Sequence, residues 1–174
     1  MSEHGAKYNV LFLGSGNAAR SVLAECILNR EGHANFRAYS AGVQAHVELD
    51  PHAVELLRQM NFNIDGLRPK AWTELTGDNA PAFDFVFTLS EDAVLLPRSA
   101  WRGRPVFAHW NIPDPAWVGG NEAEVQLAYA DAFRMLSNRI GILVNLRLHA
   151  FDRPMIQRQV DGIGKGLAAA APAA

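Results

Sequence analysis

The sequence predicts an α/β fold: a single three-layer domain with a four-stranded parallel sheet between helices on its two faces. Two observations support this fold class. Short apolar runs that are typical of buried strands alternate along the chain with stretches of helical pattern. The chain has 174 residues, of which 49% are hydrophobic, and this length and composition suit one domain with a sizeable core.

The first half of the chain contains two expected strands and two expected helices. Residues 8–13 (YNVLFL) form an apolar run that ends at a glycine, as a buried parallel strand does. A helical pattern follows over residues 17–30, and residues 36–42 (FRAYSAG) are expected to form the second strand. Asp50 is expected to cap the next helix, which has Pro51 at its first position.

The rest of the chain supplies two more strands and three more helices, one of which is short. A polar stretch with one short helix leads to the third expected strand, residues 83–89 (FDFVFTL), and the fourth is residues 104–110 (RPVFAHW). An irregular loop rich in proline and glycine follows (NIPDPAWVGGN). A long helical pattern starts at Glu122, and a last helix is expected over residues 154–164 (PMIQRQVDGIG).

The composition limits the function classes. With 16 Lys and Arg against 18 Asp and Glu, the net charge is -2, so neither nucleic-acid binding nor membrane binding through a basic segment is expected. No apolar run approaches the roughly 20 residues that span a bilayer, and the first ten residues lack the apolar core of a secretion signal. We therefore expect a cytoplasmic protein, with one domain over residues 1–165 and a disordered alanine-rich tail over residues 166–174.

The cysteine and histidine contents argue against disulfide and metal chemistry. Cys26 is the single cysteine, which excludes an intrachain disulfide and a cysteine-based metal cluster. We expect it to be a buried thiol on the core side of the first helix. The 6 histidines show no i, i+4 pair and are interpreted as isolated side chains, so neither a metal nor a cofactor is expected.

The turn between the first strand and the first helix has the composition of an anion-binding loop. Gly14 and Gly16 allow backbone conformations that other residues avoid, so that successive N–H groups can point inward as an anion nest. The helix that follows adds unpaired N–H groups and a partial positive charge. Arg20 stands where it can bind an oxyanion through two hydrogen bonds. The simpler alternative is a plain strand-to-helix turn.

Two polar residues are expected to support this loop. Asn17 tolerates a left-handed conformation and can brace the loop, and Ser21 can hydrogen-bond back into it. Ligands of parallel sheets bind at the carboxyl ends of the strands, which is where this loop lies. We predict a phosphate, arsenate or sulfate anion as ligand, bound by Gly14, Ser15, Gly16, Asn17, Ala18, Ala19, Arg20 and Ser21.

The stretch VLFLGSGNAARS resembles the start of low-molecular-weight protein-tyrosine phosphatases and their arsenate-reductase relatives. These proteins have a cysteine, five residues, and then arginine and serine directly after the first strand. The resemblance continues in YSAG, HAVELLRQM, FDFVFT, HWNIPDP and AFRMLSNRI and covers roughly residues 8–164; SAG, HW and NIPDP favour the arsenate-reductase branch. It implies a phosphatase-I-like fold with the strand order 2-1-3-4.

The resemblance also implies which reactive groups are missing. Gly14 stands six positions before Arg20 and so occupies the position of the family's nucleophilic cysteine. The reductases use further cysteines after the third strand, where this chain has TLSEDAVLLPRSAW, with Ser90 and Arg98 near the expected sites. Arsenate reduction needs one thiolate that attacks arsenic and another thiol that resolves the adduct, and the phosphatases form a cysteine phosphoester. Cys26 lies too far along the first helix to replace either thiol.

Three residues near the loop leave alternatives open. Asp114, in NIPDP, matches the family's general acid; here it is either a gate that hydrogen-bonds to a protonated oxyanion or an aspartate that shapes a turn between prolines. Trp117 lies near the family's substrate-flanking aromatic residue but at a different spacing, which argues against a phosphotyrosine substrate. Ser15 is the only hydroxyl beside Gly14, and the sequence reveals no base that would make it a nucleophile.

Three functions are compatible with these features. The first is an oxyanion-binding pseudoenzyme, non-catalytic because Gly14 replaces the nucleophilic cysteine, which serves as a binder, a sensor or the regulatory partner of an unknown protein. The second is an arsenate reductase or a tyrosine-phosphatase-type enzyme with residual or thiol-assisted activity. The third is an interaction module with an idle loop. We predict the first, because Asn17, Arg20, Ser21 and Asp114 all remain compatible with an anion site.

Overall fold

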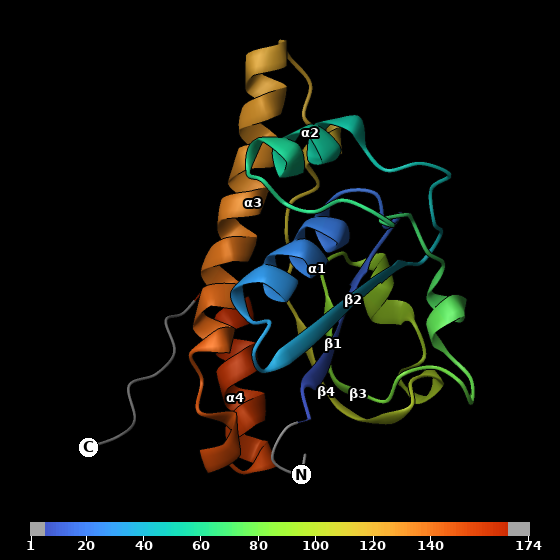
Figure 1. Ribbon diagram of the computed structural model, residues 1–174, viewed down its shortest axis with the longest axis vertical. Coiled ribbons are helices and arrows are strands. Elements are labelled where there is room, and N and C mark those ends of the chain that lie inside the picture. Colours follow the sequence, from blue (N-terminus) through green and yellow to red (C-terminus); the bar gives the residue numbers. More distant parts are fainter. Residues whose placement is uncertain (1–5, 167–174) are drawn as a thin grey trace.

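The computed structural model describes residues 6–166, and four parallel strands form the sheet at its centre (Figure 1). The strands are β1 (Tyr8–Gly14), β2 (Phe36–Gly42), β3 (Phe83–Thr88) and β4 (Gly103–His109), and their order in the sheet is β2-β1-β3-β4. This order confirms the prediction. Because β1 lies between β2 and β3, its carboxyl end at Gly14 is flanked by the carboxyl ends of both neighbours.

One face of the sheet carries the main core. The α-helices of the described residues are α1 (Arg20–Glu31), α2 (Pro51–Gln59), α3 (Glu122–Val144) and α4 (Arg153–Gly164). Figure 1 shows α1, α3 and α4 gathered on one side of the sheet, with α2 beside the upper part of α3. Phe12 and Phe87 on the sheet pack there against buried side chains of these helices, and the Trp110 ring stacks on Phe87 with 4.0 Å between the ring centroids.

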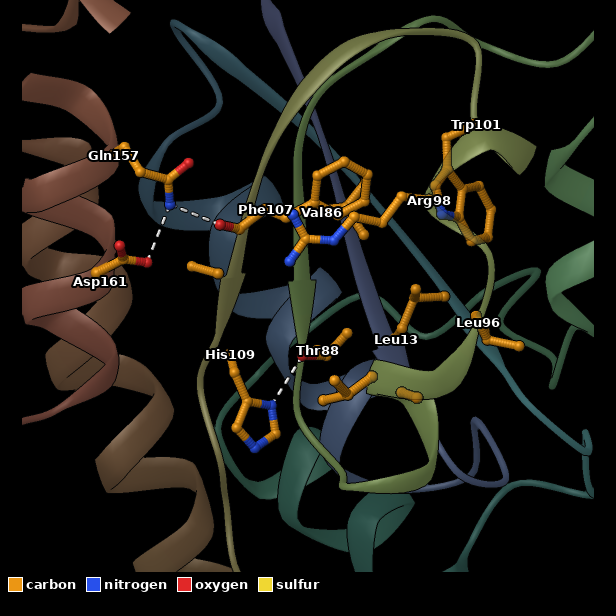
Figure 2. Close-up of a pocket in the computed structure, with 13 residues that line it drawn as sticks. Leu13, Val86, Thr88, Leu96, Arg98, Trp101, Phe107, His109, Gln157 and Asp161 are labelled. Carbon is orange, nitrogen blue, oxygen red and sulfur yellow. Dashed lines mark hydrogen bonds between the residues drawn. The ribbon is translucent and has the colours of Figure 1, made fainter. Parts of the chain in front are cut away.

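The opposite face is covered by short 3₁₀-helices. They are η1 (Trp72–Leu75), η2 (Asp92–Leu95) and η3 (Arg98–Ala100), and η1 is the short helix expected in the polar stretch. Two further 3₁₀-helices lie in other connections: η4 (Pro115–Trp117) precedes α3, and η5 (Leu148–Ala150) precedes α4. A second, smaller core on this face joins Leu11 and Val86 of the sheet to Trp101. This thin cover leaves a cavity of about 230 Å³, across which the Arg98 guanidinium lies 4.7 Å from the centroid of the Phe107 ring (Figure 2).

The element boundaries differ by a few residues from the expected ones. The first helix begins at Arg20 and not at Asn17, because Asn17 has φ 51°, a left-handed conformation that a right-handed helix cannot include. The expected cap of α2 is confirmed, since the Asp50 carboxylate accepts hydrogen bonds from the N–H groups of His52 and Ala53. Apart from the later start of α1, the strand and the helix on either side of the candidate site lie where the sequence predicts them.

One prediction concerns residues at and beyond the end of the described range. The tail predicted over residues 166–174 lies outside it except for Gly166. Within residues 6–166, none of the helices combines the length and the apolar character needed to cross a lipid bilayer.

Candidate functional site

The loop of residues 15–19 connects β1 to α1 at the carboxyl edge of the sheet. The segment that follows β2 anchors the outer side of this loop, because its N–H groups donate to loop carbonyl oxygens at 2.8–3.0 Å. The four bonds run from Val43 to Gly14, from Gln44 to Ser15, from His46 to Gly16 and from Asp50 to Ala18. The carbonyl groups of the loop are therefore directed away from its inner side.

The second feature of this loop is the state of its main-chain N–H groups. Within the described part of the chain, no main-chain nitrogen of residues 15–21 donates a hydrogen bond to a protein oxygen. These residues line a cavity of about 430 Å³, and they include the first turn of α1, where unpaired N–H groups carry partial positive charge. Bound carbonyls on one side and free N–H groups on the other give the loop the geometry of an anion nest.

Asn17 holds the loop in the way that the sequence predicts. Its φ of 51° places it in the left-handed region, and its side chain is buried. The side-chain Nδ2 of Asn17 donates to Ser21 Oγ at 2.8 Å, while its Oδ1 accepts a hydrogen bond from the Lys70 N–H at 2.8 Å. The loop is thus fixed both to the first turn of α1 and to the segment before η1.

The glycines of the loop do not have the backbone conformations that the sequence predicts. Neither Gly14 nor Gly16 has a positive φ, so their predicted role in an unusual backbone conformation is wrong. A Cβ at Gly16 would lie 2.4 Å from the exposed His46 ring. A close backbone approach to the loop involves Gly42 at the end of β2, where a Cβ would lie 2.8 Å from the main-chain nitrogen of Asn17. The glycine of YSAG therefore lets the loop pass directly against the sheet edge.

Arg20 and Asp114 meet at the cavity. Arg20 Nη2 lies 3.2 Å from Asp114 Oδ2, and Arg20 Nη1 donates to the carbonyl oxygens of Ile112 at 2.9 Å and Leu89 at 3.4 Å. The other oxygen of Asp114 accepts a hydrogen bond from the Ala116 N–H and so begins η4. Asp114 therefore shapes a turn, which is one of the two roles that the sequence left open, and it faces the anion loop; its role as a gate for a protonated oxyanion stays a prediction.

Ser15 has a carboxylate partner that sequence reasoning missed. Its Oγ donates to Asp92 Oδ1 at 2.8 Å, and Ser90 Oγ donates to the same oxygen at 2.6 Å. Burial alone raises the pKa of Asp92, but the hydrogen bonds from Ser90 and Ser15 outweigh this effect and hold the pKa below its ordinary value. Asp92 follows the carboxyl end of β3, next to that of β1, and this position in the sequence was a signal that it belongs to the site.

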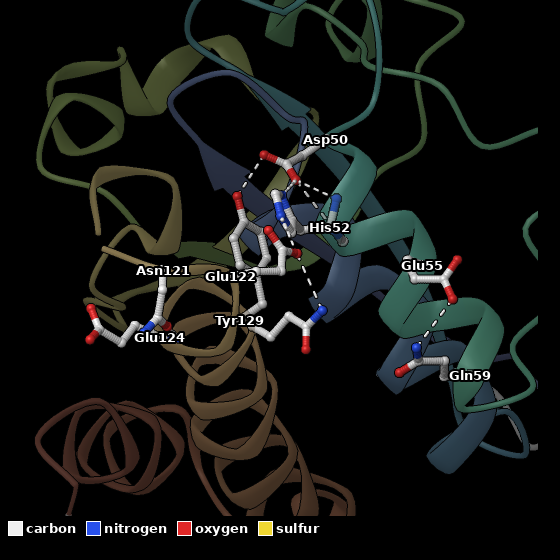
Figure 3. A network of polar contacts seen from close by, with 10 residues as sticks. Asp50, His52, Glu55, Gln59, Asn121, Glu122, Glu124 and Tyr129 are labelled. Carbon is white, nitrogen blue, oxygen red and sulfur yellow. Dashed lines mark hydrogen bonds and ion pairs between the residues drawn. The ribbon is translucent and has the colours of Figure 1, made fainter. Parts of the chain in front are cut away.

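A polar network supports the wall of the cavity near Asp50 (Figure 3). The Tyr129 hydroxyl of α3 donates to Asp50 Oδ2 at 2.7 Å, and the Tyr129 ring stacks on His52 with 5.0 Å between centroids. His52 Nε2 lies 3.2 Å from Glu122 Oε1. Burial, and then the hydrogen bond to Asp50, raise the pKa of Tyr129, so its hydroxyl remains a donor. The network joins α2 to α3 beside the loop.

The remaining predicted residues lie as follows. Trp117 lines the cavity but is 87% exposed, so it forms part of the rim. Cys26 is buried in α1, as expected, and burial followed by the charge of Glu25 raises the pKa of its thiol to about 12. Among residues 6–166, no three histidine, cysteine, aspartate or glutamate side chains are grouped to hold a metal ion.

Four parallel strands in the order 2-1-3-4, with an N–H-lined loop between the first strand and the first helix, define the phosphatase-I class of α/β proteins. The family model "Low molecular weight phosphotyrosine protein phosphatase" matches residues 9–150, and this chain belongs to that family. The resemblance inferred from the sequence motifs is confirmed.

Its similar proteins include arsenate reductases. The enzyme of Oceanobacillus iheyensis is 28% identical over 141 residues, which are 79% of this chain and 95% of that protein. The enzyme of Shouchella clausii is 33% identical over 124 residues, 68% of this chain and 82% of that protein. An arsenate reductase solved in the phosphate binding state shares the fold with a TM-score of 0.60 at 22% identity, over 77% of this chain and 97% of that chain.

Proposed function

We propose that this protein is an oxyanion-binding pseudoenzyme of its family, which holds phosphate, arsenate or sulfate at residues 14–21 without turning it over. The observation that carries the proposal is the run of main-chain N–H groups in residues 15–21 without a protein acceptor among the described residues. Arg20 adds a cationic donor beside them. The phosphate binding state of an arsenate reductase with this fold supports the class of ligand. A cytoplasmic location remains a prediction from the sequence.

The absence of a reactive thiol supports the non-catalytic part of the proposal. Gly14, at the position of the family's nucleophile, has no side chain. Cys26, the single cysteine of the sequence, is buried and has a thiol pKa of about 12, so it supplies almost no thiolate near neutral pH. The Asp114 carboxylate accepts hydrogen bonds from Arg20 and Ala116, and without a covalent intermediate we infer that it serves binding and not acid catalysis.

Loss of a thiolate favours binding of the ground state. A thiolate and an anionic ligand about 4 Å apart repel each other by up to roughly 4 kcal/mol at an effective dielectric constant near 20. Removal of that charge, with the N–H groups and Arg20 retained, strengthens the binding of the anion itself. An enzyme gains rate only from interactions that are stronger in the transition state, so this change converts a turnover site into a holding site.

One observation favours a second candidate, a phosphatase-type enzyme that uses Ser15. Ser15 Oγ lies beside Gly14 and donates to Asp92 Oδ1 at 2.8 Å, the arrangement of a hydroxyl next to a carboxylate base. This candidate requires release of phosphate from a small aryl phosphate, and that release must be lost in Ser15→Ala. Turnover that persists in Cys26→Ser and disappears in Ser15→Ala would establish it and overturn the pseudoenzyme.

Calorimetric titration with phosphate and arsenate tests the main proposal. We expect one anion to bind per chain, with affinity reduced at least about tenfold in Arg20→Ala, because that variant loses a charge-assisted donor. Arg134→Ala is the matched control, since Arg134 lies on the exposed side of α3 in an ion pair with Asp131. Arsenate-dependent thiol oxidation and aryl phosphate hydrolysis should both stay at the level of the blank. Unchanged affinity in Arg20→Ala would show that the anion binds elsewhere.

A further inference from the structure

The charged side chains around the candidate anion cavity are mostly acidic. Asp50, Asp92 and Asp114 line it together with Arg20 and His46. The Asp50 carboxylate is occupied by its hydrogen bonds from the start of α2 and from Tyr129. The other two carboxylates contact residues that line the cavity, since Asp92 accepts a hydrogen bond from Ser15 and Asp114 accepts one from Arg20. A ligand on the N–H groups therefore approaches groups that accept hydrogen bonds.

Ser15 strengthens this acceptor character. Its hydroxyl proton is donated to Asp92, so Ser15 Oγ presents only lone pairs to a ligand. An ionised carboxylate is likewise an acceptor without a proton to give. The low pKa of Asp92 keeps it ionised near neutral pH. One side of the cavity thus offers donors, the N–H groups and Arg20, while the rim at Asp92 and Asp114 offers acceptors.

Tetrahedral oxyanions differ in whether they carry a proton that they can donate to these acceptors. Phosphate and arsenate retain at least one proton near neutral pH and can donate it to a carboxylate, whereas sulfate and molybdate are fully ionised and cannot. We propose, on the basis of the proposed anion site, that Asp92 and Asp114 make the site prefer oxyanions that carry a proton, phosphate and arsenate, over proton-free sulfate, which the same site binds more weakly. Selectivity of this kind arises from the repulsion of the wrong ligand as much as from attraction of the right one.

Two ligand pairs of similar shape test the selectivity: phosphate against sulfate and arsenate against molybdate. Calorimetric titration at neutral pH and constant chloride concentration measures each affinity. In the wild-type protein we expect the protonated anion of each pair to bind at least about tenfold more tightly than its proton-free partner. The proton-free anion has no proton to donate to the carboxylates, so its negative charge is repelled by theirs. Equal affinities within both pairs would overturn the inference but leave the proposed function standing. No binding of any of the four anions would overturn the proposed function itself, and the inference with it.

Variants identify the carboxylates. Asp92→Asn and Asp114→Asn each replace a charge by an amide that can also donate, so we expect sulfate affinity to rise and the phosphate-to-sulfate ratio to fall about tenfold. Asp131→Asn, which changes an exposed carboxylate of α3, should keep the wild-type ratio. A wild-type ratio in both folded pocket variants would overturn the assignment to these residues. If the thermal unfolding transition shows that one variant does not fold, the ratio of the other decides in the same way.

Discussion

Arg20 Nη2 lies 3.2 Å from Asp114 Oδ2, while Nη1 of the same guanidinium donates to the Ile112 carbonyl at 2.9 Å. The Arg20 side chain is only 10% exposed, so this ion pair is less screened by solvent than those on the surface. The contacts join the first turn of α1 to the loop that follows β4. An anion bound as proposed would share Arg20 with Asp114, and the five N–H donors of a guanidinium make this sharing feasible.

Arg20→Lys tests this use of both nitrogens. Lysine keeps the positive charge, but its single ammonium group cannot reproduce the planar fork that spans Asp114, Ile112 and the ligand. We expect phosphate affinity to fall about tenfold in a calorimetric titration. Arg134→Lys, at an exposed ion pair of α3, should leave the affinity unchanged. Full affinity in Arg20→Lys would mean that charge alone is required.

Gly42→Ala tests the close approach of the loop to the sheet edge. The new Cβ would lie 2.8 Å from the nitrogen of Asn17 and 2.8 Å from the carbonyl carbon of Gly16, and backbone atoms yield less easily than side chains. We expect a loss of about 1–3 kcal/mol in the free energy of unfolding, measured by chemical denaturation, and weaker phosphate binding. Gly141→Ala is the control, because nothing lies within 4 Å of its Cβ and α3 should gain about 0.5–1 kcal/mol there. Equal stabilities of the two variants would contradict the tight contact.

The sequence predicts those parts of the site that depend on local geometry. The left-handed conformation of Asn17 and the position of Arg20 three residues later follow from an asparagine in a short turn before a helix. Ser15 and Asp92 are 77 residues apart, and their contact depends on the adjacency of β1 and β3, which a search for local motifs does not use. The constraint at Gly42 was missed for the same reason, since it arises where two separate segments touch.

The strand order was predicted through the resemblance to a family and the alternation of strands and helices. The cover of the second face was harder to predict, because η1, η2 and η3 are too short to show a helical period in the sequence. The expected backbone roles of Gly14 and Gly16 failed on a physical point. The loop reaches its shape through Asn17, which can adopt a positive φ and also supplies two hydrogen bonds.

Gly14→Cys restores a thiol at the position of the family's nucleophile. A Cβ at Gly14 would lie 3.2 Å from Ser21 Oγ, so a small adjustment of that hydroxyl accommodates it and the variant should fold. We expect the introduced thiol to have a pKa below the ordinary value of about 8.5, because N–H groups and Arg20 stabilise a thiolate. The pH dependence of alkylation by iodoacetamide measures this pKa, with Cys26 as a buried, unreactive background.

The control for that measurement is Gly162→Cys, where nothing lies within 4 Å of the new Cβ on α4. Its thiol should titrate near the ordinary value. The same pKa in both variants would contradict a field of N–H donors around residue 14. The thiolate at residue 14 should also weaken phosphate binding, because the two charges repel.

Glu25→Gln tests how the stability of the folded protein depends on pH. Burial raises the pKa of Glu25 above its ordinary value of 4.5, and the charge of Lys70 offsets this only in part. The folded state therefore binds the proton more tightly than the unfolded state, and its stability falls as the pH rises from about 4.5 through the raised value. Glutamine cannot ionise, so we expect Glu25→Gln to be more stable than wild type at pH 7 and to lose this advantage near pH 4.

Chemical denaturation at several pH values between 4 and 7 measures this difference. Glu31→Gln, at an exposed carboxylate of the same helix, is the matched control and should show no such trend. An advantage of Glu25→Gln that does not change with pH would mean that the ionisation of Glu25 is not its cause.

The most direct test of the anion site is an amide NMR titration of the isotopically labelled protein with phosphate. We expect the main-chain amide signals of residues 15–21 to shift together and to saturate with one dissociation constant, because their N–H groups acquire an acceptor. Signals of Val86 and Trp101, at the cavity on the other face of the sheet, should stay in place (Figure 2). Saturating shifts confined to that second cavity, or no shift of residues 15–21 at any phosphate concentration, would contradict the proposed binding site.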